Sequence, residues 1–221
     1  MEPRLTHIDE NEVLRYLRYH SPVIPEDILE DVARCRQVIL DTAKPRAVYR
    51  IFDWDPDLPL PGTEFIPGGE DIRALLRDCR QVILFGATLG AEVDNLLRRA
   101  QIRNMADAVI LDCCGSAAIE NVCDNLCDVL QASLPGYLTD RFSPGYGDFP
   151  FSQQPEFCRV LDMQRRIGVS LTPGGLMVPQ KTVTALLGVS DRPQQKRRDC
   201  AGCTQYEACE YRKEGMSCGK A

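Results

Sequence analysis

The sequence has little positive charge, only two histidines and no long apolar run, and these scarcities exclude whole classes of protein. Its 26 Lys and Arg residues stand against 32 Asp and Glu residues, a net charge of −6, which gives no electrostatic basis for holding nucleic acid or an anionic membrane. No apolar run approaches the roughly 18–20 residues that cross a bilayer. The N-terminal segment MEPRLTHIDENEV also lacks the apolar core of a secretion signal. We therefore expect a cytoplasmic protein that binds neither nucleic acid nor membrane.

What the sequence has in excess is cysteine. Eleven cysteines among 221 residues are not expected to form structural disulfides in a reducing compartment, and an odd number cannot all pair within one chain. Seven of them are spread through segments that look regular, and we expect these to be small buried hydrophobic residues: Cys35, Cys79, Cys113, Cys114, Cys123, Cys127 and Cys158. The other four crowd into residues 200–221, so the cysteines form two populations.

The pattern of apolar residues and of Gly and Pro predicts an α+β fold. Helices are expected at 11–19, 25–42, 70–80, 91–103, 105–130 and 157–167, and strands at 47–54 and 82–85, with a broken strand at 170–178, a helix or strand at 183–187 and a loop at 55–69. Because the strands are irregularly spaced, we expect a mixed or antiparallel sheet flanked by helices instead of regular βα units. The apolar pattern ends near residue 190, which predicts one domain over 1–190 and a small cysteine-rich tail over 191–221.

One hexapeptide, CRQVIL, occurs twice, at 35–40 and at 79–84. The first copy continues a helical stripe, whereas the second is followed by Phe85 and Gly86, where an extended run is more natural. The same six residues are therefore predicted to form a helix in one place and a strand in the other.

The segment RFSPGYGDFP at 141–150 has the composition of a ligand-binding loop. Pro144 and Gly145, with a second glycine at Gly147, predict a tight turn whose backbone a ligand can approach closely. Arg141 and Tyr146 add a cation and an aromatic ring to this loop. The combination indicates a small-molecule site.

Five short motifs, taken together with their spacing along the chain, resemble the activation domain of cobalamin-dependent methionine synthase, in its short stand-alone form. They are RFSPGYGDFP at 141–150, VSLT at 169–172, MVP at 177–179, FGATLG at 85–90 and GSAAIE at 115–120. The resemblance covers roughly residues 10–190. It implies the fold of that domain and the binding of S-adenosylmethionine.

The resemblance also implies roles for individual residues. Arg141 would bind the methionine carboxylate, for which a planar guanidinium is well suited. Glu120, on the predicted helix upstream, would receive the amino group, and Gly145, Tyr146 and Gly147 would lie along the ligand. No general base is needed, which agrees with the scarcity of histidine.

The reaction implied by the resemblance is the reductive methylation of cob(II)alamin, which needs one electron and a methyl group from S-adenosylmethionine. The protein would supply the positioning of the methyl donor. The chain shows no Asp-x-His-x-x-Gly cobalamin motif and is too short for homocysteine and folate modules. It is therefore expected to act on a separate cobalamin-binding methionine synthase or corrinoid protein, with a flavodoxin or ferredoxin as electron donor. The alternative is an iron–sulfur redox or binding module that activates a corrinoid protein without methyl transfer.

The C-terminal cysteines have the spacing of metal or cluster ligands: Cys200, Cys203, Cys209 and Cys218. Four thiolates within so short a segment, opened by a Cys-x-x-Cys pair, suit zinc or an iron–sulfur cluster. The spacing itself does not choose between the two, whereas the electron required by the implied reaction favours iron–sulfur.

This tail leads to the first testable prediction. Protein purified without oxygen is expected to be brown and to contain about four irons per chain, as one four-iron cluster held by four cysteines would give. Elemental analysis and visible absorption measure this directly, and a Cys200→Ser variant should lose the colour. A colourless protein that contains about one zinc would instead assign the cysteines a structural role.

Overall fold

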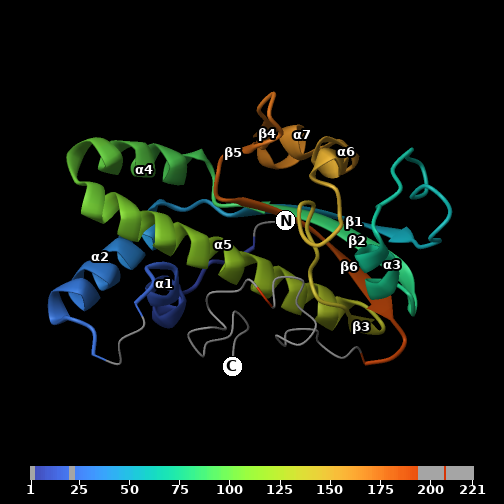
Figure 1. The fold of residues 1–221 in the computed structure, drawn as a ribbon, viewed down its shortest axis with the longest axis horizontal. Helices are drawn as coiled ribbons and strands as arrows, with labels where there is room; N and C mark the ends of the chain where they lie inside the picture. The colour runs from blue at the N-terminus through green and yellow to red at the C-terminus, as the bar shows by residue number, and fades with distance from the viewer. Residues whose placement is uncertain (1–2, 20–22, 194–206, 208–221) are drawn as a thin grey trace.

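A four-stranded antiparallel sheet, in the order β1-β2-β6-β3, lies between two groups of helices in the computed structural model (Figure 1). The structure describes residues 3–19, 23–193 and 207. The sheet consists of β1 (Arg46–Asp53), β2 (Cys79–Thr88), β6 (Thr182–Ser190) and the short β3 (Tyr137–Leu138). A separate hairpin joins β4 (Ser170–Leu171) to β5 (Met177–Val178). The expected α+β fold is thus confirmed, and its sheet is antiparallel.

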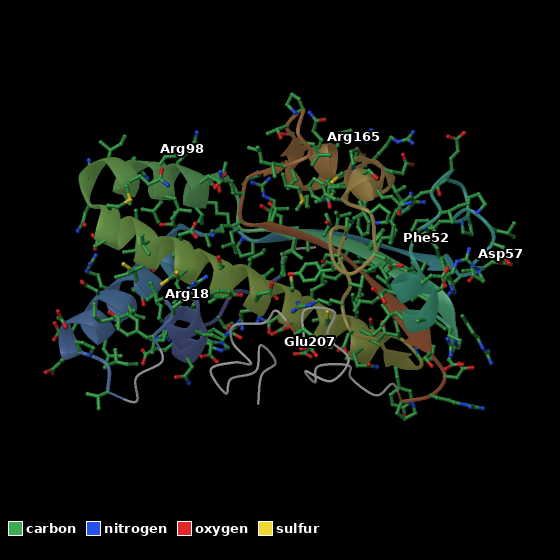
Figure 2. The ribbon with its side chains drawn as sticks, in the orientation of Figure 1. Arg18, Phe52, Asp57, Arg98, Arg165 and Glu207 are labelled. Atoms are coloured by element: carbon green, nitrogen blue, oxygen red, sulfur yellow. The ribbon has the colours of Figure 1, made fainter. Side chains whose placement is uncertain are left out.

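Both faces of the sheet are covered by helices. On one face lie α1 (Glu10–Tyr16), α2 (Glu26–Thr42), α4 (Ala91–Arg103) and the long α5 (Met105–Ser133). On the other lie α3 (Glu70–Leu75), α6 (Gln154–Leu161) and α7 (Met163–Ile167), preceded by the single turn η1 (Phe151–Gln153). Charged side chains of the outer helices, such as Arg98 and Arg165, project away from the sheet (Figure 2).

Strand β2 supplies side chains to both hydrophobic cores. Ile83 and Phe85 belong to the core under α1, α2, α4 and α5, whereas Val82 and Leu84 belong to the core under α3, α6 and α7. All four side chains are fully buried. The alternation follows from the pleat of a strand, in which successive side chains point to opposite faces.

Helix α5 begins at a sequence-encoded cap and is then fastened to the sheet by a lysine. The side chain of Asn104 accepts hydrogen bonds from the backbone N–H groups of the first turn, as N-cap residues do. Farther along, Lys181 lies over Gly115 and its Nζ is 2.8 Å from Asp112 Oδ1 and 2.9 Å from Ser116 Oγ. These contacts fix the start of β6 against the middle of α5.

Several predicted boundaries are confirmed and others are wrong. The helix predicted at 91–103 has the observed bounds of α4, and the ambiguous segment 183–187 is part of strand β6. The helix predicted at 70–80 already ends at Leu75, because the chain turns into β2 at Cys79. The helix predicted at 157–167 is two helices, because Asp162 adopts a left-handed conformation with φ of 52°.

Other differences lie at element ends. The helix predicted at 11–19 ends at Tyr16, and the long helix predicted to end near 130 continues to Ser133. The broken strand at 170–178 is the β4–β5 hairpin, and the two-residue strand β3 was not predicted. Of the seven cysteines expected in the core, four are buried and Cys79, Cys113 and Cys127 are only half-buried. None of the helices in the described part of the chain is both long and apolar enough to span a membrane.

The packing of β6 against the loop before β2 leads to a stability prediction. A Cβ atom at Gly188 would collide with Cys79 Sγ and lie 2.7 Å from Leu76 Cδ2. Gly188→Ala is therefore expected to lower the free energy of unfolding by about 1–3 kcal/mol, as overpacking does. Gly174→Ala is the control, because its Cβ would be 3.9 Å from Thr172 Oγ1. Urea denaturation measures both, and equal stability of the two variants would contradict this account of the packing.

Candidate functional site

The backbone of residues 137–142 follows the edge of β6 and sets the direction of each side chain. After β3, Phe142 exchanges both of its backbone hydrogen bonds with Leu186, at 3.0 and 2.8 Å. Phe142 packs into the core under α6 and stacks with Phe149. Because neighbours in an extended segment point to opposite faces, the side chain of Arg141 is directed toward α5.

Arg141 is held by two carboxylates from successive turns of α5. Its Nη2 donates a hydrogen bond to Glu120 Oε2 at 2.8 Å and lies 3.0 Å from Asp124 Oδ1. The arginine side chain is 17% exposed, and its Nη1 is buried with no hydrogen-bond partner among the described residues. A buried guanidinium with one unused nitrogen is suited to receive an anion.

The environment keeps this arginine charged. Burial opposes the charge, but the negative charges of Glu120 and Asp124, and that of Cys123 once its thiol ionises at high pH, outweigh it, so that the pKa of Arg141 is raised above its ordinary value. Burial also raises the pKa of the Cys123 thiol, which keeps that neighbour in its neutral form at physiological pH. The guanidinium therefore stays protonated at physiological pH, while the two carboxylates beside it give the site a local charge of −1.

A cavity of about 310 Å³ opens beside Arg141. It is lined by residues of α5, of the segment that leads to Arg141 and of β6, most of them polar: Asp124, Cys127, Asp128, Gln131, Leu138, Thr139, Asp140, Arg141 and Leu187. Glu120 is not one of the residues that line this cavity. Asp124 was not predicted, although its position four residues after Glu120 places both carboxylates on one helix face.

The glycine-containing loop after Arg141 is fastened to a different element, helix α3. The carboxylate of Asp148 accepts hydrogen bonds from the backbone N–H groups of Glu70 and Asp71, at 2.6 and 3.1 Å. Asp71 Oδ2 in turn accepts one from the Asp148 N–H at 3.3 Å. Gly147 has φ of +51°, and a Cβ there would collide with Asp71 Oδ2, so a glycine is required for this close approach.

The structure thus brings together only part of the predicted site. Arg141 and Glu120 are in direct contact, so these two predicted residues lie side by side. Gly145, Tyr146 and Gly147 are not among the described residues that line the cavity beside Arg141. Tyr146 is instead 68% exposed, so this loop offers an open surface beyond the arginine.

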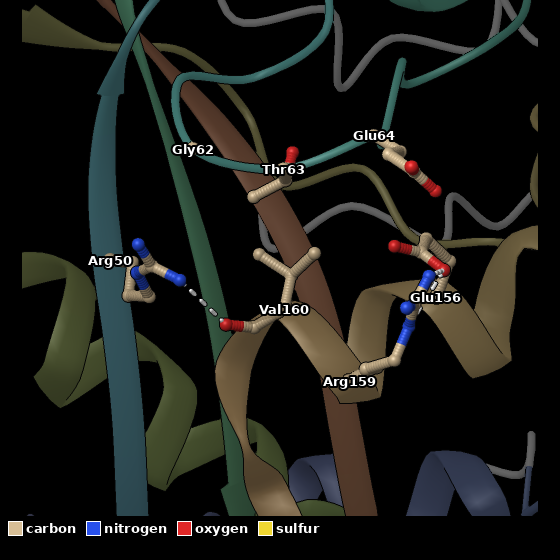
Figure 3. A pocket seen from close by; sticks show the side chains of 7 residues that line it. All are labelled: Arg50, Gly62, Thr63, Glu64, Glu156, Arg159 and Val160. Atoms are coloured by element: carbon tan, nitrogen blue, oxygen red, sulfur yellow. Dashed lines mark hydrogen bonds and ion pairs between the residues drawn. The ribbon is translucent and has the colours of Figure 1, made fainter.

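A second cavity, of about 570 Å³, lies between β1, the arm that contains Gly62 and helix α6 (Figure 3). Arg50 Nη1 there donates to the carbonyl oxygen of Val160 at 3.0 Å, and Arg159 is paired with Glu156 (Figure 3). Neither of these arginines has a buried terminal nitrogen that lacks a partner in the described part of the chain, as Nη1 of Arg141 does.

No group of three or more His, Cys, Asp or Glu side chains that could hold a metal ion occurs within residues 3–19 and 23–193. The predicted ligands Cys200, Cys203, Cys209 and Cys218 lie outside the described residues.

Comparison with known proteins gives a match at the level of structure. No protein-family model and no curated protein matches this sequence. The fold matches a solved structure described as the MetH reactivation domain bound to AdoHcy, with a TM-score of 0.62. The match covers 95% of this chain and 82% of the other, at 14% identity. The chain thus has the fold of a methionine synthase activation domain, as the motifs predicted.

The surroundings of Glu120 lead to a prediction about alkaline stability. Burial, together with the charge of Glu120, raises the pKa of Tyr16 from 10.0 to about 12. Between these pH values the unfolded chain loses the tyrosine proton while the folded protein keeps it, so stability should fall as the pH rises. Urea unfolding at several pH values measures this. Tyr16→Phe should weaken the fall, and an unchanged pH dependence in this variant would contradict the assignment.

Proposed function

We propose that this protein, which has the fold of a methionine synthase activation domain, binds S-adenosylmethionine and supports reductive methylation of cob(II)alamin on a separate partner. The partner would be a cobalamin-dependent methionine synthase or a related corrinoid methyltransferase. The solved structure with this fold is described as bound to AdoHcy, the product that S-adenosylmethionine leaves after methyl transfer. That description supports the choice of ligand class.

The observation that carries the proposal is the unpartnered Nη1 of Arg141. A buried donor without a partner costs on the order of 1–3 kcal/mol, and a ligand carboxylate that reached Nη1 from the adjoining cavity would remove that cost. The methionine part of the ligand presents one carboxylate and one ammonium group. Arg141 suits the first, and the acidic residues that hold it, including the predicted Glu120, suit the second.

The ligand, once bound, supplies an electrophilic sulfonium methyl group, so the protein needs no general base. The work left to the chain is to hold the amino-acid end in the Arg141 cavity and to leave the methyl group accessible. We assign Gly145, Tyr146 and Gly147 to the surface along which the rest of the ligand lies. Their exposed position agrees with a donor that must face a second protein.

The remaining components belong to partners or to the C-terminal tail. Cobalamin would be bound by the partner protein, and a flavodoxin or ferredoxin would deliver the electron. We retain the C-terminal cysteines as ligands of an iron–sulfur cluster or zinc. A cluster held there would provide a route for that electron.

Calorimetry with S-adenosylhomocysteine, the stable product of methyl transfer, tests the proposal. Arg141→Ala is expected to weaken binding by about 10- to 100-fold, because a hydrogen bond to a charged group contributes about 1.5–3 kcal/mol. Arg141→Lys keeps the positive charge but not the planar guanidinium, so its affinity should lie between those of the unmodified protein and Arg141→Ala.

Arg165→Ala is the matched control, because Arg165 on α7 has a side chain that is 86% exposed. It removes the same side chain far from the cavity and should bind as the unmodified protein does. Absence of binding to the unmodified protein, or equal losses in Arg141→Ala and Arg165→Ala, would reject the proposed function and favour a redox module without methyl transfer.

A further inference from the structure

The two carboxylates that hold Arg141 differ in their access to the cavity beside it. Asp124 lines the cavity beside the arginine, whereas Glu120 is not among the described residues that do. Asp124 is also the less exposed of the two, with 29% of its side chain accessible against 41% for Glu120. A ligand in the cavity would therefore meet Asp124 first.

The geometry of the guanidinium limits how a carboxylate can bind. Nη1 is unused, but Nη2 already faces both Glu120 and Asp124. A ligand carboxylate that binds both terminal nitrogens, as arginine prefers, would have to take the place of one of these partners on Nη2. Asp124, at 3.0 Å and on the cavity side, is the partner in that position.

We propose that Asp124 binds the ammonium group of the ligand's amino-acid end, while Glu120 remains on Arg141 as a positioning residue. The inference rests on the proposed function, since it assumes a ligand with an α-amino acid group. It differs from the role that the sequence resemblance gives to Glu120.

The exchange leaves every charge with an opposite neighbour. In the ligand-free site one guanidinium faces two carboxylates, a local charge of −1. The amino-acid group of the ligand adds no net charge. When it is bound, charges of alternating sign follow one another from Glu120 to Arg141, the ligand carboxylate, the ligand ammonium and Asp124. Because the ammonium and carboxylate are attached to the same carbon, Asp124 needs to move only from the guanidinium to the adjacent group. Each half-buried charge then keeps a partner, which avoids the cost of an unpaired one.

Other acidic residues of the cavity are less suited to this role. Asp128, one turn farther along α5, is exposed, so an ion pair there would be weakened by water. Asp140 lies on the segment before Arg141 and not on α5, the helix whose carboxylates pair with the guanidinium. Asp124 is the cavity carboxylate within 4 Å of the guanidinium among the ion pairs of the described residues.

The test compares two ligands: S-adenosylhomocysteine and its analogue in which the amino group is replaced by hydrogen. Asp124→Asn is expected to weaken the binding of S-adenosylhomocysteine by about 10- to 100-fold and to leave the binding of the analogue nearly unchanged. Asp124→Glu should recover part of the affinity for the first. Asp41→Asn, which removes an exposed carboxylate of α2, is the control for net charge and should change neither.

Each outcome separates this inference from the function on which it rests. If the unmodified protein binds neither ligand, both the proposed function and the role of Asp124 are rejected. If it binds S-adenosylhomocysteine but Asp124→Asn behaves like Asp41→Asn, only the role of Asp124 is wrong. An amino-group-dependent loss in Glu120→Gln without one in Asp124→Asn would place the ammonium on Glu120. Urea unfolding of each variant separates a binding loss from a loss of folded protein.

Discussion

The fold depends on the burial of both faces of its central strands. An antiparallel sheet can leave one face in water, but here β2 presents an unbroken apolar run whose alternate side chains enter two different cores. Neither helix layer is dispensable, because each covers side chains that the other cannot reach. The requirement extends to the irregular arm before α3, which contributes Leu60 and Phe65 to the second core.

The same two-sided sheet arranges the residues of the candidate site. The segment after β3 pairs with the edge of β6, so adjacent residues are sent to opposite layers: Phe142 to the core under α6 and Arg141 to α5. The loop that follows is then tied to α3 through Asp148. A cation next to a cavity and an exposed glycine loop are thus held by separate elements, and the rigid sheet fixes the relation between them.

Most elements could be predicted from local patterns, whereas contacts across the molecule could not. The hexapeptide CRQVIL forms part of α2 in its first copy and part of β2 in its second, as its two contexts predicted. The error at 157–167 arose because a single left-handed residue, Asp162, divides a continuous apolar pattern. Arg141 and Glu120 were predicted as partners of one ligand, and they do meet. Asp124 was missed because the direction in which α5 faces the cavity is set by packing against the sheet, which no local pattern records.

The buried thiols can be chemically modified only when the protein unfolds, so their modification records unfolding events. Cys35 and Cys114 are fully buried, and burial raises their pKa values to about 11 and about 12. Since the thiolate is the form that oxidants and alkylating agents attack, these sulfurs are inert while the helices stay packed. A molecule that opens exposes them, and a modification acquired then adds bulk and polarity that the tight core cannot accommodate on closing. Oxidation would therefore make a brief opening of the core irreversible and remove that molecule from the folded population. The lifetime of the folded protein in the presence of oxygen would then depend on how often this core opens.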